Sequence, residues 1–540
     1  MTNERRRLFI KGAITLSTAG LISRLMGFAY RIVLPRVIGA EGVGLYQLAY
    51  PIYTTLLVVS TSGLPVALAK MISDKITKKD YKFAYKIFRV CLNMSIGIGL
   101  FLSLLMAVLA GPIIDIFSWD PRSIYSILAI TPAVFFVSIM STYRGFFQGL
   151  QNMVPTAFSQ VTEQFFRIVT MVILVFLLLP YGIEFAAAGA TFGAVVGAIT
   201  GLLVLLYIYY NKREDIWDKI DRQTTVTSFN TRKIAQDIIS LAVPVTFGAL
   251  ILPLMSFIDA AIVPARLQIA GFDNFMELYG QLSGMALVLV HFPTIFTLSL
   301  AKSLVPAISE AAALEDFGLI KRRTESSFRL TILIALPSAV GLFVLAEPLT
   351  TVIFDSPGAA IPLRFVAWGV LFISVKQVTA AILQGLGKAT IPARNLLIGA
   401  IFNAFINYFL TALPGFGIRG AALGTVSGFA IASFLNLYYT SKWTDFDVDW
   451  RRFLLKPFIA VVVMYIVISE GFAVVYNIYS YFLVDYSYTL TTFSMVFLGA
   501  LIYPFVLLLL NEIKYGDLIL IPKVGKYIAD FLSNWGLLKK

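Results

Sequence analysis

Residues 182–193 read GIEFAAAGATFG, and residues 417–428 read GIRGAALGTVSG. Six positions are identical at a constant offset of 235 residues: Gly182, Ile183, Ala186, Ala187, Gly189 and Gly193 in the first copy, and Gly417, Ile418, Ala421, Ala422, Gly424 and Gly428 in the second. A further match precedes each copy, because Gln148, Gly149, Leu150 and Pro155 recur as Gln384, Gly385, Leu386 and Pro392 with one inserted residue. Glycine and alanine runs are common in any membrane helix. Two matches in the same order nevertheless predict an internal duplication.

The composition around these copies is that of a membrane protein. Of 540 residues, 58% are hydrophobic and 14% are charged, whereas soluble domains have about 45–50% and about 25%. This excludes a water-soluble globule. Because a bilayer-spanning helix needs about 20 apolar residues, we expect an all-α polytopic protein with about fourteen spans. The apolar stretches are 12–36, 44–69, 87–112, 123–145, 156–180, 185–210, 236–264, 280–306, 327–348, 363–384, 395–413, 418–440, 453–476 and 489–511.

The duplication divides these spans into two lobes. We expect an N-lobe at 1–211, a cytoplasmic linker at 212–233, a C-lobe at 234–441, two further helices at 442–513, and a basic tail at 514–540. The offset of 235 residues covers an even number of spans, so both six-helix lobes would have the same orientation in the membrane. Such a parallel repeat is typical of alternating-access transporters. The tail is compatible with either an amphipathic helix on the membrane surface or a frayed end.

Positive charge is unevenly distributed between the predicted loops. Of the 43 Lys and Arg residues, 33 fall on the side that holds both termini, five on the other side and five within spans. The positive-inside rule therefore predicts that both termini are cytoplasmic. The single Cys91 excludes an intrachain disulfide, and the single His291 excludes a zinc site made of several histidines.

Two arginines lie within the first predicted span. Arg24 and Arg31 are seven residues apart and so share one helix face about 10 Å apart. Guanidinium groups bind phosphate through paired, charge-assisted hydrogen bonds, so this face suits an anionic ligand, and Lys376 could add charge to the same cavity. The alternatives are that Arg24 pairs with a buried carbonyl and that Arg31 snorkels to the outer interface.

A set of oxygen-bearing side chains lies in the predicted second lobe. Asp259, Asn403, Asn407 and Thr425 would make a hard-oxygen site for a monovalent cation such as sodium, and the alternative is ordinary hydrogen bonding between helices. Glu163 and Arg167 are four residues apart on one predicted helix and are expected to form an ion pair.

A family resemblance rests on several motifs. The signature between the fourth and fifth spans contains Arg144, Gly145, Gln148, Gly149, Pro155, Glu163 and Arg167, and further motifs lie at 23–28, 39–46 and 303–310. Together they resemble the stage V sporulation protein B branch of the multidrug, oligosaccharidyl-lipid and polysaccharide exporter superfamily, over nearly the whole chain.

The resemblance implies a flippase for an undecaprenyl-diphosphate-linked saccharide, first of all lipid II, because the related MurJ flippases carry that cargo. Arg24 matches the family's diphosphate-binding arginine in the motif Ser-Arg-x-x-Gly-Phe. The second arginine of helix 1 in the MurJ flippases aligns with Tyr30, and Arg31 is the next residue. Their helix 8 arginine aligns near the apolar Val288, and their helix 2 arginine has no evident counterpart in this sequence. The sodium site of some MurJ proteins resembles the Asp259 set, with Asn407 where an aspartate is expected.

The resemblance also implies a bacterial plasma-membrane protein in contact with membrane lipids and wall-synthesis proteins, with no nucleic acid and no cofactor besides sodium. A flippase for another lipid-linked polysaccharide unit and a cation-coupled multidrug exporter are alternatives, although such exporters rely on a first-lobe carboxylate that the first span lacks. The short outer loops disfavour a glycosyltransferase, and arginine within a span disfavours a pure scaffold. The saccharide, the driving ion and a vegetative or sporulation role stay open.

Overall fold

The computed structural model describes residues 3–214, 218, 220, 223, 230–447, 449–482, 484–512, 527 and 530. The side chains of residues 3–11, 13, 14, 17, 24, 450 and 452 lie outside this description. Within these ranges every regular element is helical, which confirms the predicted all-α class. The helices form two compact units, residues 1–284 (unit 1) and residues 285–540 (unit 2).

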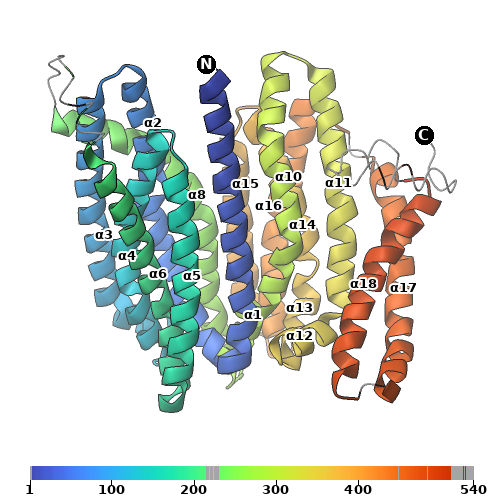
Figure 1. Cartoon of the computed structure of the whole chain (residues 1–540). Helices are drawn as coiled ribbons and strands as arrows, with labels where there is room; N and C mark the ends of the chain where they lie inside the picture. Colours follow the sequence, from blue (N-terminus) through green and yellow to red (C-terminus); the bar gives the residue numbers. More distant parts are fainter. Residues whose placement is uncertain are drawn as a thin grey trace. The chain divides into compact units, whose positions relative to one another are not determined.

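Unit 1 contains the helices drawn from blue to green in Figure 1. They are α1 (Asn3–Thr61), α2 (Gly63–Thr77), α3 (Tyr81–Phe117), α4 (Ser123–Gly149), α5 (Val154–Leu178), the 3-10 turn η1 (Leu179–Tyr181), α6 (Ile183–Asn211), α8 (Thr231–Ile269), α9 (Phe275–Gly280) and most of the π-helical turn η2 (Gln281–Ala286). Aromatic rings fill part of the core: Phe88 lies 4.3 Å from Phe146 and 5.8 Å from Tyr209, measured between ring centroids. These contacts join α3, α4 and α6.

Unit 2 contains the helices drawn from yellow-green to red. They are α10 (Leu287–Ala313), α11 (Phe317–Val344), α12 (Ala346–Phe354), the turn η3 (Pro357–Ala359), α13 (Ala360–Val366), α14 (Gly369–Gly385), α15 (Thr390–Leu410), α16 (Ile418–Thr444), α17 (Trp450–Phe482), the turn η4 (Val484–Tyr486) and α18 (Ser487–Leu509). Phe328, Phe446 and Phe453 pack together and connect α11 with α17.

Twelve helical segments of the described chain are long and apolar enough to cross a bilayer, or thirteen if the pair Pro357–Val366 and Gly369–Gly385, bent by 45°, is one span. The first segment, Thr18–Thr77, has 60 residues. A straight helix of that length would be about 90 Å long, far more than the roughly 30 Å hydrocarbon core. Within α1 the backbone leaves the helical region at Gly39 (φ 66°, ψ 179°), between the two spans that the sequence predicts there. The exact count of fourteen stays a prediction.

The predicted duplication corresponds to contacts that occur in both units. A Cβ atom on Gly149 of α4 would lie 2.8 Å from the Ile72 side chain of α2, and one on Gly385 of α14 would lie 2.7 Å from the Ile308 side chain of α10. Both Ile308 and Gly385 lie 236 residues after their counterparts. The glycines that precede α6 and α16, Gly182 and Gly417, both have positive φ (143° and 47°). The copies therefore share packing as well as sequence.

Within unit 1, α1 and α9 approach each other through glycines. A Cβ on Gly44 would lie 2.3 Å from the Met276 carbonyl oxygen, and one on Gly280 would lie 1.9 Å from the Ala40 carbonyl oxygen. Gln47 Nε2 also donates a hydrogen bond to the Ser283 carbonyl at 2.8 Å. Only a residue without a Cβ fits at these crossings. This explains Gly44, which belongs to the 39–46 motif, and Gly280, which contacts Ala40 of that motif.

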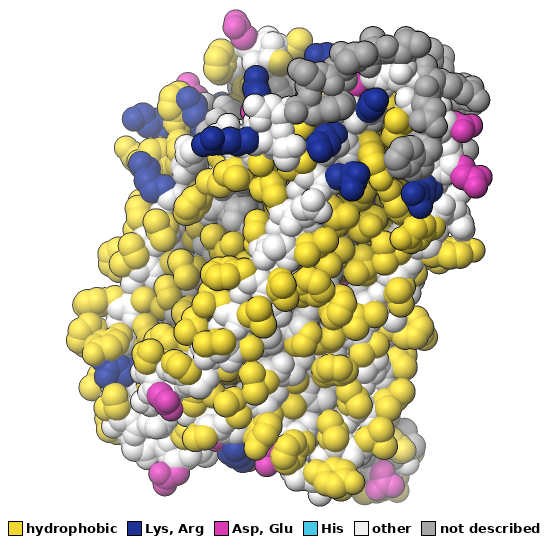
Figure 2. Space-filling view, turned by 90° about the vertical axis from the view of Figure 1, so that its left-hand side faces the viewer, with side chains coloured by type: hydrophobic (Ala, Val, Ile, Leu, Met, Phe, Trp, Pro, Cys, Tyr) yellow, Lys and Arg dark blue, Asp and Glu magenta, His cyan; other side chains and the backbone are white. Residues whose placement is uncertain are grey.

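Charge is segregated on the surface in Figure 2, which is hydrophobic over its middle and has most of its Lys and Arg side chains gathered at the upper end. This is the pattern of a membrane protein with one strongly basic end. The lobe boundaries predicted above stay predictions, as does the orientation of the termini. The predicted tail at 514–540 lies outside the described residues, except for Tyr527 and Asp530. Most of the predicted linker at 212–233 also lies outside them.

The α1 to α9 crossing yields a test. Gly280→Ala would place a methyl group against the Ala40 carbonyl, and overpacking of this kind costs about 2 kcal/mol. We expect a lower midpoint of thermal unfolding for the purified protein in detergent. Gly248→Ala is the matched control, because nothing lies within 4 Å of a Cβ at Gly248 in α8. Equal midpoints for the two variants would contradict the proposed close approach.

Candidate functional site in unit 1

An ionic cluster joins α4 and α5. One terminal nitrogen of Arg144 lies 2.8 Å from a Glu163 carboxylate oxygen, and one of Arg167 lies 3.0 Å from the other oxygen. Arg144 also donates to the Ser159 hydroxyl at 2.8 Å, and that hydroxyl donates to the Gly201 carbonyl at 2.9 Å. Each charged side chain is less than a fifth exposed (14–18%). One carboxylate therefore neutralises one of two guanidinium groups and leaves a net positive charge.

Glycines of α6 allow this cluster to form at a helix interface. A Cβ on Gly193 would lie 2.7 Å from the Arg167 carbonyl oxygen, and one on Gly197 would lie 2.7 Å from the Glu163 carbonyl oxygen. Glycines at four-residue spacing let helix backbones approach closely in membranes. The close approach covers the cluster and holds α5 in a fixed rotation relative to α6.

Four tyrosines of α1 extend from this cluster. The Tyr30 and Tyr46 hydroxyls are 3.2 Å apart, and the ring centroids of Tyr46 and Tyr50 are 5.0 Å apart, followed by Tyr50 and Tyr53 at 5.8 Å. Together we call these residues the tyrosine array. Its members interact electrostatically with arginines at both ends: Arg31 with Tyr30, and Arg167 with Tyr50 and Tyr53.

The predicted arginines of the first span both belong to α1. Arg31 has an exposed side chain next to the tyrosine array, whereas the Arg24 side chain lies outside the described residues. The helix turn between them lies against α5, since a Cβ on Gly27 would be 3.2 Å from the Gln164 amide nitrogen. Arg31, the tyrosine array and the ionic cluster therefore form one polar region within unit 1.

A second ionic group lies outside the spans, in the loop between α3 and α4. The Arg122 guanidinium lies 2.7 Å from Asp120 and 2.6 Å from Glu41. Partial burial by itself would raise the pKa of Asp120, but the hydrogen bonds from Arg122 outweigh it and hold that pKa below its ordinary value. The stabilisation from this pair is thus present above the ordinary carboxyl pKa and is lost as the pH falls through the lowered value.

Unit 2 has neutral groups at the positions that correspond to the ionic cluster. Asn395 Nδ2 donates to Asn436 Oδ1 at 2.9 Å, and these residues lie 236 and 235 positions after Ser159 and Gly201. The offset is 236 by this hydrogen bond and 237 by the match of Pro155 with Pro392, so Glu163 corresponds to Gly399 or Ala400, and Arg167 to Asn403 or Ala404. The hydrogen-bonded crossing is kept in both units, while the charges occur in unit 1.

The remaining predicted site residues are divided between the units. Asp259 of α8 belongs to unit 1 and lies within electrostatic reach of Tyr279. In unit 2, Asn407 Nδ2 donates to Asn403 Oδ1 at 3.2 Å, and the Thr425 hydroxyl donates to the Ala421 carbonyl at 3.1 Å. The Lys376 ammonium lies 5.0 Å from the centroid of the Phe429 ring. The roles assigned to these residues stay predictions.

Sequence reasoning predicted part of the unit 1 site. The Glu163 to Arg167 ion pair is confirmed. The sequence placed the third residue of the ionic cluster, Arg144, only in the family signature. Its pairing with Glu163 could not be predicted, because Arg144 lies on another helix and is not at a helical spacing from Glu163. The tyrosine array was missed, although Tyr46, Tyr50 and Tyr53 have the four- and three-residue spacing of one helix face.

Other signature residues have packing roles that the structure makes clear. A Cβ on Gly145 would lie 2.8 Å from the Pro65 backbone of α2, and Pro155 lies in the first turn of α5, where a missing N–H costs nothing. The Gln148 carbonyl accepts the Gln151 N–H at 2.9 Å in the turn after α4. The signature therefore fixes how α4 turns into α5 against α2.

Comparisons with known proteins agree with this architecture. The family model described as polysaccharide biosynthesis protein matches residues 9–312, and the MatE model matches residues 281–409. Stage V sporulation protein B of Bacillus subtilis (strain 168) is 33% identical over 525 residues, covering 97% of this chain and 99% of the relative. Lipid II flippase MurJ of the same organism is 30% identical over 450 residues, covering 79% and 81%.

A solved structure of lipid II flippase MurJ in an inward closed conformation has a TM-score of 0.66 at 17% identity and covers 94% of this chain and 100% of that chain. The fold and the relatives thus define a multi-pass membrane transporter and not an enzyme. The chain belongs to the stage V sporulation protein B and MurJ branch of the multidrug, oligosaccharidyl-lipid and polysaccharide flippase superfamily. The resemblance noted in the sequence is therefore confirmed.

The ionic cluster can be tested by removing its carboxylate. Glu163→Gln leaves the two guanidinium groups without a counter-ion, and breaking a buried ion pair in this way costs about 3 kcal/mol of the free energy of unfolding. Adding Arg144→Gln removes one of the two repelling cations, so we expect the double variant to be more stable than Glu163→Gln alone. Thermal unfolding midpoints in detergent provide the measurement. A double variant less stable than either single variant would argue against the cluster.

Proposed function

We propose that this protein is an alternating-access flippase that moves an undecaprenyl-diphosphate-linked saccharide, lipid II in the first instance, from the inner to the outer leaflet of the bacterial plasma membrane. The product would feed peptidoglycan synthesis in the vegetative wall or in the spore cortex. Support for the cargo comes from the name of the MurJ relative, and support for the cortex comes from the name of the sporulation relative.

The single observation that carries the proposal is the positive polar region of unit 1. A diphosphate head group cannot cross hydrocarbon cheaply, because its unsatisfied polar groups each cost several kcal/mol. Arg31 is an exposed residue of a membrane-spanning helix, next to tyrosine hydroxyls that can donate hydrogen bonds. Such donors suit phosphate oxygens. Together with Arg24, seven residues earlier in α1, they would receive the diphosphate.

The same surplus of positive charge disfavours the multidrug alternative. In the polar region of unit 1 the described carboxylate is Glu163, and it is already bound by Arg144 and Arg167. A cationic drug would meet no free carboxylate there. A flippase for another lipid-linked polysaccharide unit needs the same diphosphate chemistry and is the closest competing cargo.

Orientation and partners follow from the charge distribution. The basic end, which carries 33 of the 43 Lys and Arg residues in the predicted topology, would face the cytoplasm together with both termini. Membrane lipids surround the spans, and wall-synthesis proteins that consume the flipped precursor are the proposed partners. No nucleic-acid partner is proposed.

Sodium is the proposed coupling ion. Asn403 and Asn407 are fully buried and Thr425 nearly so, and their amide and hydroxyl oxygens are the hard donors that an alkali cation takes. Asp259 of unit 1, the fourth residue of the set predicted from the sequence, is proposed as the source of negative charge for the ion. When bound, the ion would couple its gradient to the transport cycle.

Growth rescue tests the cargo. The wild-type chain should restore growth to a bacterium depleted of its lipid II flippase, whereas Arg24→Ala and Arg31→Ala should lower rescue at least about tenfold in viable counts, because each removes charge-assisted hydrogen bonds to the diphosphate. Arg89→Ala is the matched control, since Arg89 of α3 is an exposed arginine outside the polar region. Membrane abundance of every variant is measured by immunoblot.

The outcomes separate cargo from mechanism. Failure of the wild-type chain to rescue growth would contradict lipid II as cargo. Rescue by both arginine variants at the level of Arg89→Ala would remove the α1 arginines from the mechanism.

The sodium proposal is tested by binding. Radioactive sodium should bind the purified wild-type protein, and Asp259→Asn should weaken binding about tenfold or more because it removes the charge of the donor set. Asp273→Asn, an exposed carboxylate in the loop before α9, should bind like the wild-type protein. Equal weakening by both variants, or none by either, would contradict the site.

A further inference from the structure

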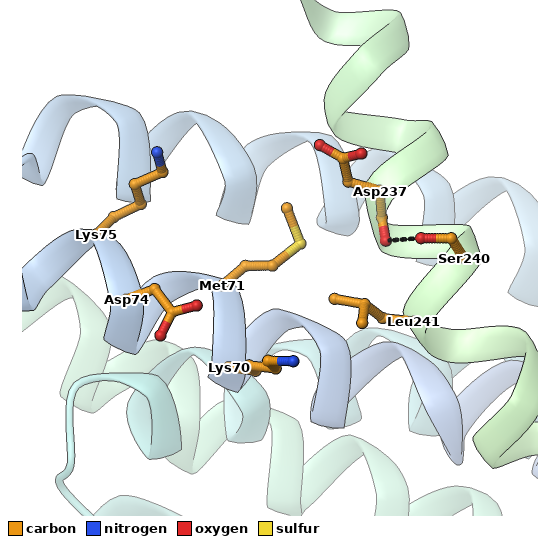
Figure 3. A pocket seen from close by; sticks show the side chains of 7 residues that line it. All are labelled: Lys70, Met71, Asp74, Lys75, Asp237, Ser240 and Leu241. Carbon is orange, nitrogen blue, oxygen red and sulfur yellow. Dashed lines mark hydrogen bonds between the residues drawn. The ribbon is translucent and has the colours of Figure 1, made fainter.

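A charged cleft lies between α2 and α8, within unit 1 and apart from the polar region described above. Figure 3 shows its lining, which comes from two helices. The lining residues are Lys70, Met71, Asp74 and Lys75 of α2 and Asp237, Ser240 and Leu241 of α8. The cavity measures about 370 Å³, within the lower part of the 300–1,000 Å³ range typical of small-molecule sites.

The cleft exists because the two helices touch closely at one level and leave space at another. A Cβ on Gly63 of α2 would lie 2.1 Å from the Ala242 carbonyl oxygen of α8, so the backbones meet there. Seven residues further along α2, and five residues earlier along α8, Lys70 and Asp237 line the cavity. The close contact at Gly63 and the lining of the cleft therefore lie at different levels of the same helix pair.

The cleft lining contains both lysines and aspartates, and these side chains do not form ion pairs with each other. Among the described residues, none of Lys70, Asp74, Lys75 and Asp237 is in an ion pair. The Lys75 ammonium lies 4.2 Å from the centroid of the Phe83 ring, and the Asp237 carbonyl, not its carboxylate, accepts the Ser240 hydroxyl at 2.9 Å. Two lysines and two aspartates therefore line one cleft, and their formal charges cancel.

The depth of the cleft matches the polar surface of the bilayer. Lys70 directly follows the apolar stretch 44–69, and Asp237 lies at the start of the apolar stretch 236–264. Residues at the ends of apolar spans lie at the level of the lipid head groups. The half-buried Met71 and Leu241 side chains add apolar surface between the charges.

We propose that this cleft binds the head group of a zwitterionic membrane phospholipid with a primary ammonium, of the phosphatidylethanolamine type. The phosphate would lie between Lys70 and Lys75, the ammonium would donate to Asp74 and Asp237, and Met71 and Leu241 would contact the adjoining methylene groups. The mixed lining selects this chemistry, since a purely anionic head group would be repelled by two carboxylates. A bound lipid would connect α2 to α8.

The cleft does not duplicate the proposed cargo site. The cargo's head group is a diphosphate with a saccharide attached, and it was assigned to the α1 arginines of the polar region. The cleft volume of about 370 Å³ suits a smaller head group. The proposal about the cleft is therefore tested independently of the proposed function, because lipid binding can be measured without transport.

The experiment is lipid binding to the purified full-length chain, measured by native mass spectrometry and by thermal unfolding in detergent with added lipid. Phosphatidylethanolamine should bind and raise the unfolding midpoint, because a ligand of the folded state stabilises it. Asp237→Asn and Lys70→Gln should each weaken binding about tenfold, the usual effect of losing a charged hydrogen bond. Both changes are at exposed positions, and unchanged midpoints without lipid will show that the variants fold.

Controls separate this site from general attraction to lipids. Lys78→Gln and Glu214→Gln alter exposed charges outside the cleft lining and should bind phosphatidylethanolamine like the wild-type protein. Phosphatidylglycerol should bind at least tenfold more weakly than phosphatidylethanolamine, as should phosphatidylcholine, whose ammonium cannot donate hydrogen bonds. Equal binding of phosphatidylglycerol, or equal loss of binding in Lys78→Gln and Lys70→Gln, would overturn the proposal.

Discussion

Close approach of helix backbones is the constraint on which this structure depends. Lipid offers no hydrophobic force between helices, so spans associate through tight packing and polar contacts. Here the packing is made at glycines: Gly197 against α5, Gly280 against α1 and Gly63 against α8. The first covers the ionic cluster, the second joins α1 to α9, and the third joins the two helices that line the charged cleft. The ionic cluster and the charged cleft thus both belong to helix pairs that meet at a glycine.

The two copies of the duplicated unit have kept this packing and lost their chemical equivalence. The Ser159 to Gly201 hydrogen bond of unit 1 corresponds to the Asn395 to Asn436 hydrogen bond of unit 2. The positions of unit 2 that correspond to Glu163 and Arg167 hold uncharged residues at either offset, 236 or 237. Charge inside a bilayer is costly unless it is paired, so its presence in unit 1 indicates a role that unit 2 does not share. A positive region in unit 1 and an amide-rich region in unit 2 fit an anionic cargo and a cation.

The sequence predicted the helical class and most spans, because apolar length is a local signal. It also predicted the Glu163 to Arg167 pair, whose spacing is local. It did not predict Arg144 as a partner of Glu163, because that contact depends on how α4 and α5 pack. The cleft between α2 and α8 was not predicted for the same reason: Lys70 and Asp237 are 167 residues apart, and tertiary packing, which includes the crossing at Gly63, brings their helices together.

The shared counter-ion of the ionic cluster has a consequence for the ancestry of the duplicated halves. Two guanidinium groups depend on one carboxylate, so the order in which these residues were gained or lost is restricted. If the common ancestor of both halves carried the cluster, the lineage of unit 2 had to lose at least one arginine no later than its glutamate. If the ancestor lacked the cluster, the glutamate had to arise no later than the second arginine in unit 1. Intermediates that break this order would have carried two cations without a counter-ion, which is costly inside a bilayer.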